Sequence, residues 1–152
     1  NTEQKSSENA KNYIREGRVL QYGYFDNEKR EYVIDNVALP CFWTNYLGVE
    51  DMAAVINHTA GGYLFYKTPE YHRISRFRGN GVAMDRPGFY VYIRDNEKKD
   101  YHSISWQPVA KDLSKAKYRC RHGLSYTVYE SEYDGLASSQ TMVIPCGENV
   151  LL

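Results

Sequence analysis

The sequence predicts an all-β protein, built as an antiparallel β-sandwich or an up-and-down barrel. Short runs of β-branched and aromatic residues recur along the chain, and Gly, Pro, Asn or Asp separates each run from the next. No stretch shows the long helical periodicity of apolar residues that marks an amphipathic helix. The 152 residues suit one domain with a sizeable core.

The chain opens with a polar segment, residues 1–18, in which Tyr13 and Ile14 are the large apolar anchors. We expect this lead-in to be a short helix or disordered, and the sandwich to cover residues 19–152, incomplete at its C-terminal end. Residues 19–25 predict the first strand. The polar residues 26–29 predict a turn, and residues 31–34 its hairpin partner.

Apolar and polar faces alternate in residues 89–93, which predicts another strand. We expect one set of side chains to face the core (Phe89, Val91, Ile93) and the other set to face away (Tyr90, Tyr92). Residues 95–100 form the turn that follows, and residues 111–117 suit one helical turn.

The last strands predicted are residues 124–129 and 136–144. The pair Asp134-Gly135 between them is a strong hairpin signal, because both residues tolerate the positive φ of a tight turn. Residues 148–152 resemble the entry to one more strand.

Charge and composition exclude several classes of function. The 19 basic residues balance the 19 acidic ones, so the chain lacks the basic excess of duplex-binding domains. Arg73, Arg76 and Arg78 surround apolar residues, which favours a solvated strand edge over a phosphate or nucleic-acid contact. No membrane-spanning run and no signal peptide are visible. Three distant cysteines indicate a reducing compartment.

A search for catalytic groups assigns no catalytic residue. The four histidines show no metal-ligand spacing, so we expect no metal site. Cys120 and His122 point the same way on a predicted strand, which favours a buried Cys beside a strand-end His over a Cys-His nucleophile. Residues 78–81 favour a glycine turn over a phosphate loop. Three carboxylates lie in turns rather than in a recognisable apolar pocket that would raise the pKa of a general acid: Asp26, Asp85 and Asp134.

Aromatic side chains give the positive signal. The chain has 15 Tyr against 5 Phe, and a Tyr ring suits both half-buried sheet faces and sugar-binding surfaces. Several aromatic residues lie near Gly, Asn, Thr or Gln, as at sugar sites or subunit interfaces: Trp43, Tyr46, Tyr63, Tyr66 and Trp106. The interpretation favoured for the two Trp residues is that they fill the core.

Five short sequence motifs occur along the chain in this order: YGYFD (22–26), WTNYLG (43–48), AGGYLFY (60–66), SWQP (105–108) and RHGL (121–124). Together with residues 26–34 and 85–95, they resemble the opening part of the β-glycoside phosphorylases of glycoside hydrolase family 94. Within that family, residues 103–109 and 121–126 are most similar to the chitobiose and cellobionic acid phosphorylases, and cellobiose phosphorylase is a more distant likeness. Each motif alone is weak evidence for the family. Several motifs in the same order over one domain make the resemblance specific.

The resemblance implies an N-terminal antiparallel β-sandwich, followed by a helical linker and an (α/α)6 barrel. In the family, the general acid is an Asp of the barrel, and inorganic phosphate is the co-substrate. Phosphate attacks a β-linked disaccharide and yields an α-sugar 1-phosphate with inversion. The resemblance further implies no metal or organic cofactor and a cytoplasmic homodimer. The sandwich would support the barrel, build the dimer interface and send loops toward the partner's active site.

Because the matching sequence stops before any barrel, we predict that the 152 residues alone are inactive. The barrel would lie in the same or a companion chain. Substrate contacts are predicted at Gly62, Tyr63 and Tyr66, with Trp43, because paired glycines let backbone approach closely and Tyr66 offers a ring and a hydroxyl. Two alternatives stay open: a free-standing carbohydrate-binding module and a structural dimerisation domain.

An uncovered sheet edge at the C-terminal end predicts association with another chain or with the rest of an enzyme. The set expected to be exposed there is Val143, Ile144, Val150, Leu151 and Leu152.

Overall fold

The computed structural model describes residues 13–15, 18–20, 22–76 and 87–152, with side chains from residue 22 onward. In these ranges every strand pairs antiparallel, and there is no helix, which confirms the all-β, antiparallel prediction. It follows that this part of the chain offers no helix long and apolar enough to cross a membrane.

The larger sheet has five strands in the order β12-β11-β10-β4-β3. Its strands are β3 (Tyr24–Asp26), β4 (Glu31–Ile34), β10 (Ala116–His122), β11 (Tyr126–Tyr133) and β12 (Leu136–Val143). The sheet therefore joins an N-terminal hairpin to the C-terminal strands.

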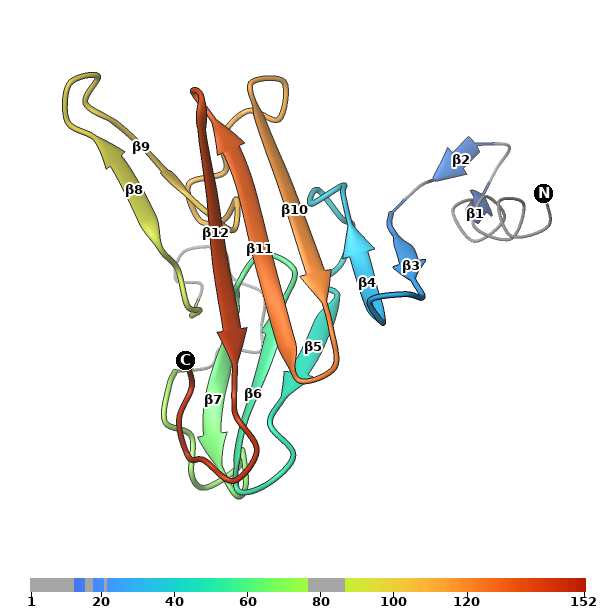
Figure 1. Cartoon of the computed structure of the whole chain (residues 1–152), viewed down its shortest axis with the longest axis vertical. Helices are drawn as coiled ribbons and strands as arrows, with labels where there is room; N and C mark the ends of the chain where they lie inside the picture. The colour runs from blue at the N-terminus through green and yellow to red at the C-terminus, as the bar shows by residue number, and fades with distance from the viewer. Residues whose placement is uncertain (1–12, 16–17, 21, 77–86) are drawn as a thin grey trace.

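A smaller sheet has the order β5-β6-β7, formed by β5 (Thr44–Leu47), β6 (Met52–Asn57) and β7 (Gly62–Tyr66). Two further hairpins complete the fold: β1 (Tyr13–Arg15) with β2 (Arg18–Leu20), and β8 (Tyr92–Asp95) with β9 (Asp100–Ser103). Figure 1 shows the β8–β9 hairpin beside the upper end of β12.

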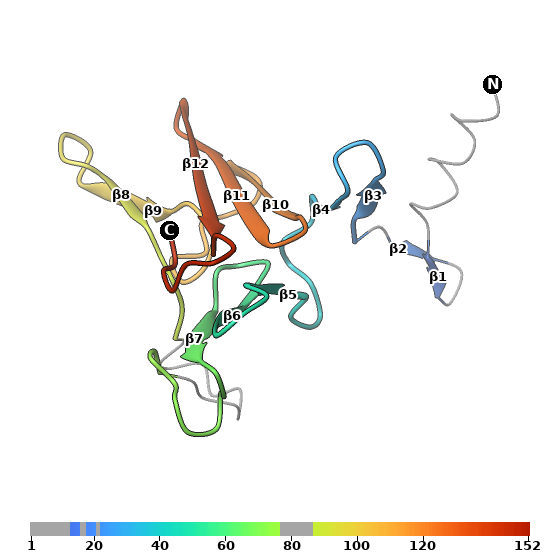
Figure 2. The same cartoon turned by 60° about the horizontal axis from the view of Figure 1, so that its bottom comes forward.

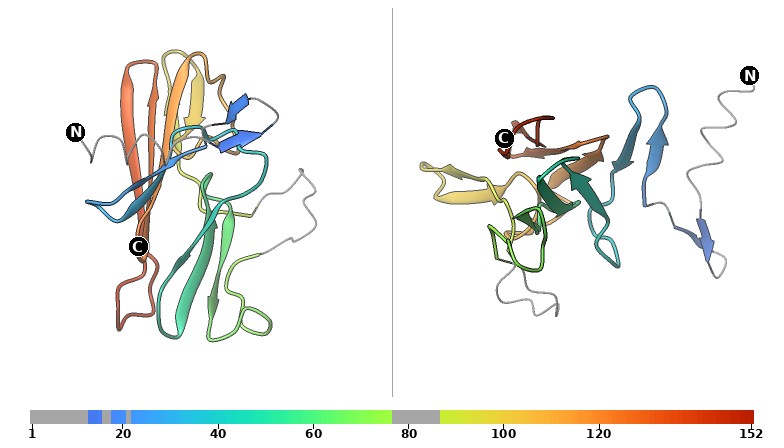
Figure 3. Two further views of the ribbon diagram at one scale, coloured as in Figure 1. Left: turned by 90° about the vertical axis from the view of Figure 1, so that its right-hand side faces the viewer. Right: turned by 90° about the horizontal axis from the view of Figure 1, so that it is seen from below.

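The two sheets form two layers, seen edge-on in the left view of Figure 3, where β5–β7 (green) lie beside the lower half of β10–β12 (orange to red). Figure 2 shows the same separation from another angle. The main core lies between the layers, with buried residues from both sheets: Ile34, Leu47, Met52, Ala54, Ile56, Cys120, Tyr129 and Met142. A second, smaller cluster of Val37, Ala116 and Tyr118 packs against Trp106 and Tyr133.

Polar side chains link the layers. The Tyr129 hydroxyl on β11 is buried and donates to the Asn57 carbonyl at the end of β6, at 2.7 Å. The Asn45 amide on β5 donates to the carbonyls of Gly123 and Tyr126, at 3.0 Å each. These bonds fix the relative position of the two sheets, because buried hydrogen-bonding groups are costly to leave unpaired.

The turns predicted at residues 26–29 and at Asp134-Gly135 are confirmed. The Asp26 carboxylate accepts hydrogen bonds from the backbone N–H groups of Glu28 and Lys29, at 3.1 Å each, and so closes the β3–β4 turn. Asp134 and Gly135 have φ values of 53° and 79° between β11 and β12, which matches the primed turn expected of a two-residue hairpin. The Asp134 carboxylate pairs with Lys98 of the β8–β9 turn.

The predicted strand at residues 89–93 is partly wrong. β8 begins at Tyr92, and Val91 is exposed whereas Tyr90 packs against the core. The physical reason is that Phe89 donates its backbone N–H to the Ala60 carbonyl, at 2.9 Å, so this stretch follows the loop after β6 instead of a regular ladder. Within the polar lead-in, Tyr13–Arg15 form a strand rather than a helix.

The prediction of which residues are exposed at the C-terminal end is also partly wrong. Ile144 is buried and Leu151 packs against the main core, while Val150 and Leu152 are exposed. Val143 and Leu152 exchange two backbone hydrogen bonds, at 3.0 and 2.9 Å, which covers part of the β12 edge.

Residues 111–117 contain a single turn, in which the Ala116 N–H donates to the Asp112 carbonyl, at 3.1 Å. The glycine turn at residues 78–81 and the Asp85 turn lie outside the described residues.

Candidate functional site

Trp43 lies just before β5, at a corner where elements of both sheets meet. Its half-buried ring has its centroid 5.0 Å from that of Tyr32 and 6.3 Å from that of Tyr22. Its carbonyl accepts the backbone N–H of His58, at 2.9 Å, and lies 3.2 Å from Nε2 of His122. These contacts give Trp43 a structural role, while its predicted contact with sugar stays a prediction.

Tyr63 and Tyr66 lie on opposite faces of β7. Tyr66 lies opposite the buried Met52 of β6 in the strand register. The Tyr66 hydroxyl donates to Asp51, at 3.0 Å. Tyr63 pairs with Val55 on the outer face, where its ring lies 5.9 Å from that of Phe65. The structure therefore does not bring the two tyrosines onto one surface, and each remains a separate candidate.

Gly62 is a glycine for a structural reason. Its φ is +153°, and a Cβ there would come within 2.0 Å of the Val55 carbonyl oxygen on β6. The backbone at Gly62 does approach another group closely, as the sequence predicts. The group approached in the structure is the backbone of β6.

Trp106 fills space in the smaller cluster, and its indole N–H donates to the Lys111 carbonyl, at 2.9 Å. This packing supports the interpretation of Trp106 as a core residue.

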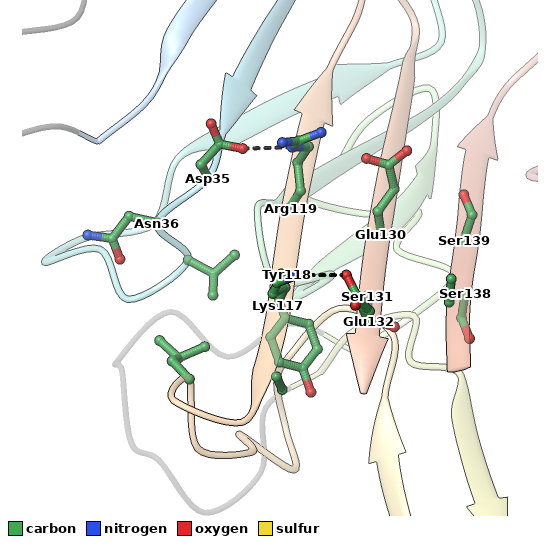
Figure 4. Close-up of a pocket in the computed structure, with 14 residues that line it drawn as sticks. Asp35, Asn36, Lys117, Tyr118, Arg119, Glu130, Ser131, Glu132, Ser138 and Ser139 are labelled. Carbon is green, nitrogen blue, oxygen red and sulfur yellow. Dashed lines mark hydrogen bonds and ion pairs between the residues drawn. The ribbon is translucent and has the colours of Figure 1, made fainter. Parts of the chain in front are cut away.

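A large groove that the sequence did not predict lies beside β10 (Figure 4). β4 pairs with β10 at Cys120, Arg121 and His122, and the earlier residues of β10 instead border the segment that leaves β4. The groove has a volume of about 820 Å3. Such a size is within the range of ligand-binding pockets.

Ion pairs and hydroxyls line this groove. Arg119 donates to Asp35, at 2.6 Å, and Lys117 to Glu132, at 3.0 Å. The hydroxyls of Tyr118 and Ser131 are buried and have no hydrogen-bond partner among the described residues. The groove can thus bind a polar surface, whereas its carboxylates already hold structural ion pairs. The alternation of charged residues along 117–121 and 130–132 is the sequence signal that could have indicated it.

An ion network around the buried Glu31 lies on the same face of the larger sheet as Arg119. Glu31 accepts hydrogen bonds from Arg121, at 2.9 Å, and from the Tyr126 hydroxyl, at 2.7 Å. Arg121 also donates to Glu130, at 3.0 Å. The bond to Glu31 is the main reason that the pKa of Tyr126 is raised. The network joins β4, β10 and β11. It therefore gives Arg121, the arginine of the RHGL motif, a structural role.

Cys120 and His122 do point the same way, with Sγ 3.8 Å from the imidazole nitrogens. Burial raises the pKa of the Cys120 thiol far above its ordinary value and lowers the pKa of His122 to about 4. A nucleophilic pair needs the thiolate, which these shifts oppose. The structural interpretation of this pair is therefore confirmed, and among the described residues no cluster of metal ligands is present.

Comparison with known proteins shows the family that this chain resembles. Residues 30–152 match the family model described as "Glycosyl hydrolase 94, supersandwich domain". The chain is 54% identical, over 130 residues, to the N,N'-diacetylchitobiose phosphorylase of Vibrio proteolyticus and 52% identical to that of Vibrio furnissii. A solabiose phosphorylase of Paenibacillus borealis is 30% identical over 131 residues.

These matches cover most of the chain but a small part of the relatives. The two Vibrio alignments include 86% of this chain and 16% of each relative's length. The solabiose phosphorylase alignment includes 81% of this chain and 16% of that enzyme.

Proposed function

The chain belongs to the supersandwich-domain family of glycosyl hydrolase 94, and we propose that it is the N-terminal sandwich of an inverting phosphorylase of β-linked disaccharides. The observation that carries the proposal is the identity of 54% and 52% to two N,N'-diacetylchitobiose phosphorylases over 130 residues. This level favours a disaccharide of the chitobiose type over cellobiose or cellobionic acid.

The reaction we propose breaks the glycosidic C–O bond while an oxygen of inorganic phosphate bonds to the anomeric carbon from the opposite face. The leaving oxygen takes a proton from a general acid. Such an acid needs a raised pKa. Hydrogen bonds instead hold the pKa values of Asp95, Asp100 and Asp112 below the ordinary value. These carboxyls are therefore unsuited to the role, which we assign to a barrel beyond this chain.

In this proposal the sandwich supports the barrel, takes part in a homodimer interface and sends loops toward a substrate site. The enzyme would work in the cytoplasm without a metal or an organic cofactor. The hydrogen-bond networks of the sandwich suit this supporting role, because the Glu31–Arg121 bonds and the Tyr129 bond to Asn57 fix strands of both layers.

The test compares two proteins: the natural polypeptide that carries this chain, and the 152-residue chain alone. Each is incubated with inorganic phosphate and N,N'-diacetylchitobiose, cellobiose or cellobionic acid, and sugar 1-phosphate is measured. We expect turnover of diacetylchitobiose by the natural polypeptide and none by the chain alone. Inactivity of the natural polypeptide on all three sugars would refute the proposed reaction, and turnover by the isolated chain would refute the division of roles.

A further inference from the structure

The last strand of the larger sheet, β12, has an open edge in the part of the chain that the structure describes. β12 is the terminal strand of the order β12-β11-β10-β4-β3, and all eight of its residues pair with β11 on its other side. In an antiparallel pair, the backbone N–H and C=O groups of alternate residues point to opposite edges of a strand. Half of the backbone groups of β12 therefore point away from β11.

The sequence of β12 gives this edge little protection. Natural edge strands avoid pairing with other chains by being short, by carrying charged residues or Pro, or by bulging. β12 is eight residues long, has no charged residue and no Pro, and keeps an unbroken register with β11. At the opposite edge of the same sheet, β3 has only three residues and ends in Asp26. The contrast indicates that β12 is built to be covered by another strand.

The first backbone pair of such a strand is already present. After β12 the chain reverses through a turn in which the Glu148 N–H donates to the Pro145 carbonyl, at 3.2 Å. Leu152 then donates its N–H to the Val143 carbonyl, at 2.9 Å, and accepts the Val143 N–H, at 3.0 Å. Two residues that exchange both bonds form a hydrogen-bonded pair of an antiparallel ladder. Figure 1 shows the C-terminus beside the arrowhead of β12, on the side away from β11.

This pair fixes the register of any residues that continue in the same direction. Each further residue lies opposite the preceding residue of β12, and hydrogen-bonded pairs recur at every second position. The second, fourth and sixth residues after Leu152 would thus bond to Thr141, Ser139 and Ala137. The side chains of these three β12 residues are exposed, so they leave the edge accessible.

The burial of the last residues agrees with the same register. Directly opposite residues of an antiparallel pair share one face of the sheet. The register places Leu151, which packs against the main core, opposite the buried Ile144. The exposed Leu152 lies on the other face. The next residue would therefore face inward, opposite the buried Met142.

We propose that the residues directly after Leu152 in the natural polypeptide form a strand that pairs antiparallel along β12 as far as Leu136. The larger sheet would thereby gain one strand. The inference rests on the proposed function in one respect, namely that the polypeptide continues past Leu152, in accord with the 16% share of each Vibrio relative's length. A second copy of the chain is a weaker occupant. Leu152 already bonds to Val143, and a directly attached segment has a far higher effective concentration.

Amide hydrogen exchange tests the pairing. The natural polypeptide that carries this chain is exchanged in deuterated buffer and read residue by residue by mass spectrometry. We expect the N–H groups of Ala137, Ser139 and Thr141 to exchange at least about tenfold more slowly there than in the 152-residue chain. Ser138 and Gln140 are the matched controls, because their N–H groups point to β11 and should exchange slowly in both proteins.

Two outcomes of this experiment would overturn the proposal. The first is equal exchange of the three edge amides in the two proteins. The second is slow exchange that depends on the concentration of the natural polypeptide, because a second copy would then cover the edge.

A designed disulfide tests the register. The background is the natural polypeptide with Cys41→Ser and Cys146→Ser, which removes the two exposed thiols of this chain. Ser139→Cys is then combined with cysteine at the fourth residue after Leu152. Hydrogen-bonded pairs have Cα atoms about 5.5 Å apart, within the range of a disulfide. We expect a cross-link between these two positions, identified by peptide mapping.

The control for this disulfide moves the second cysteine by one position, to the third residue after Leu152. Its side chain would point to the other face of the sheet, and two Cβ atoms that point apart cannot be bridged. Equal cross-linking of the two pairs, or cross-linking of the control pair alone, would overturn the proposed register.

The outcome is separable from that of the proposed function. Edge protection and the expected cross-link in a polypeptide that turns over none of the three sugars would refute the phosphorylase reaction alone. Phosphorolysis by a natural polypeptide whose edge amides stay unprotected would refute the added strand alone.

Discussion

Replacing Arg121 with methionine should destabilise the fold strongly, because it leaves a carboxylate buried without its cation. The side chain of Glu31 is 3% exposed, and Arg121 donates to both of its oxygens, at 2.9 and 3.2 Å. In Arg121→Met, the neutral Tyr126 hydroxyl still donates to Glu31, but no positive charge replaces the guanidinium. Removing one member of a buried ion pair costs about 3 to 5 kcal/mol.

Arg119→Met is the matched control. Arg119 lies two residues earlier on the same face of β10, and it pairs with Asp35 at 2.6 Å. The side chains of this second pair are 50% and 45% exposed, so water can solvate Asp35 when the arginine is removed. We expect the control to lose about 1 kcal/mol or less, the usual contribution of an exposed pair.

The assay is urea unfolding of both variants and of the unchanged chain, monitored by tryptophan fluorescence. With an m-value of about 2 kcal/mol per molar urea, Arg121→Met should lower the midpoint by about 2 M and Arg119→Met by about 0.5 M or less. Glu31→Gln in the Arg121→Met background should recover part of the loss, because no charge is then buried. Equal midpoints for the two arginine variants would refute the assignment of the Glu31–Arg121 pair as a buried structural network.

Two further predictions follow from backbone geometry and thiol burial. Gly62→Ala should lower the melting temperature more than Gly147→Ala: both positions have positive φ, but a Cβ at Gly62 meets the Val55 carbonyl at 2.0 Å and one at Gly147 meets nothing within 4 Å. Equal shifts in calorimetry would contradict this packing. In thiol titration at neutral pH, the two exposed cysteines should react in the native chain, whereas Cys120 should react after denaturation because burial raises its pKa. Three fast thiols would contradict its burial.

Local chemistry made much of the fold predictable from the sequence. Asp134-Gly135 specifies a tight turn by its φ preferences, and Asp26 closes its own turn through nearby N–H groups. Both hairpins therefore follow from contacts between neighbours in sequence. The same locality explains why the Cys120–His122 pair could be interpreted correctly.

Long-range contacts account for what the sequence did not predict. Arg121 meets Glu31 across 90 residues because β4 pairs with β10, and no local pattern specifies that pairing. Phe89 bonds to the loop after β6, which overrides the alternation that predicted a strand there. A small cleft between the β8–β9 hairpin and the β11–β12 turn likewise depends on how one hairpin sits against another, so its residues carry no motif.

The configuration of the sugar phosphate is the sharpest test of the proposed phosphorolysis. The natural polypeptide that carries this chain is incubated with N,N'-diacetylchitobiose and inorganic phosphate, and the sugar phosphate is followed by proton and phosphorus NMR. We expect an α-sugar 1-phosphate, because phosphate attacks the β-linked anomeric carbon from the opposite face. A β-sugar 1-phosphate, or free sugars formed without phosphate consumption, would contradict an inverting phosphorylase.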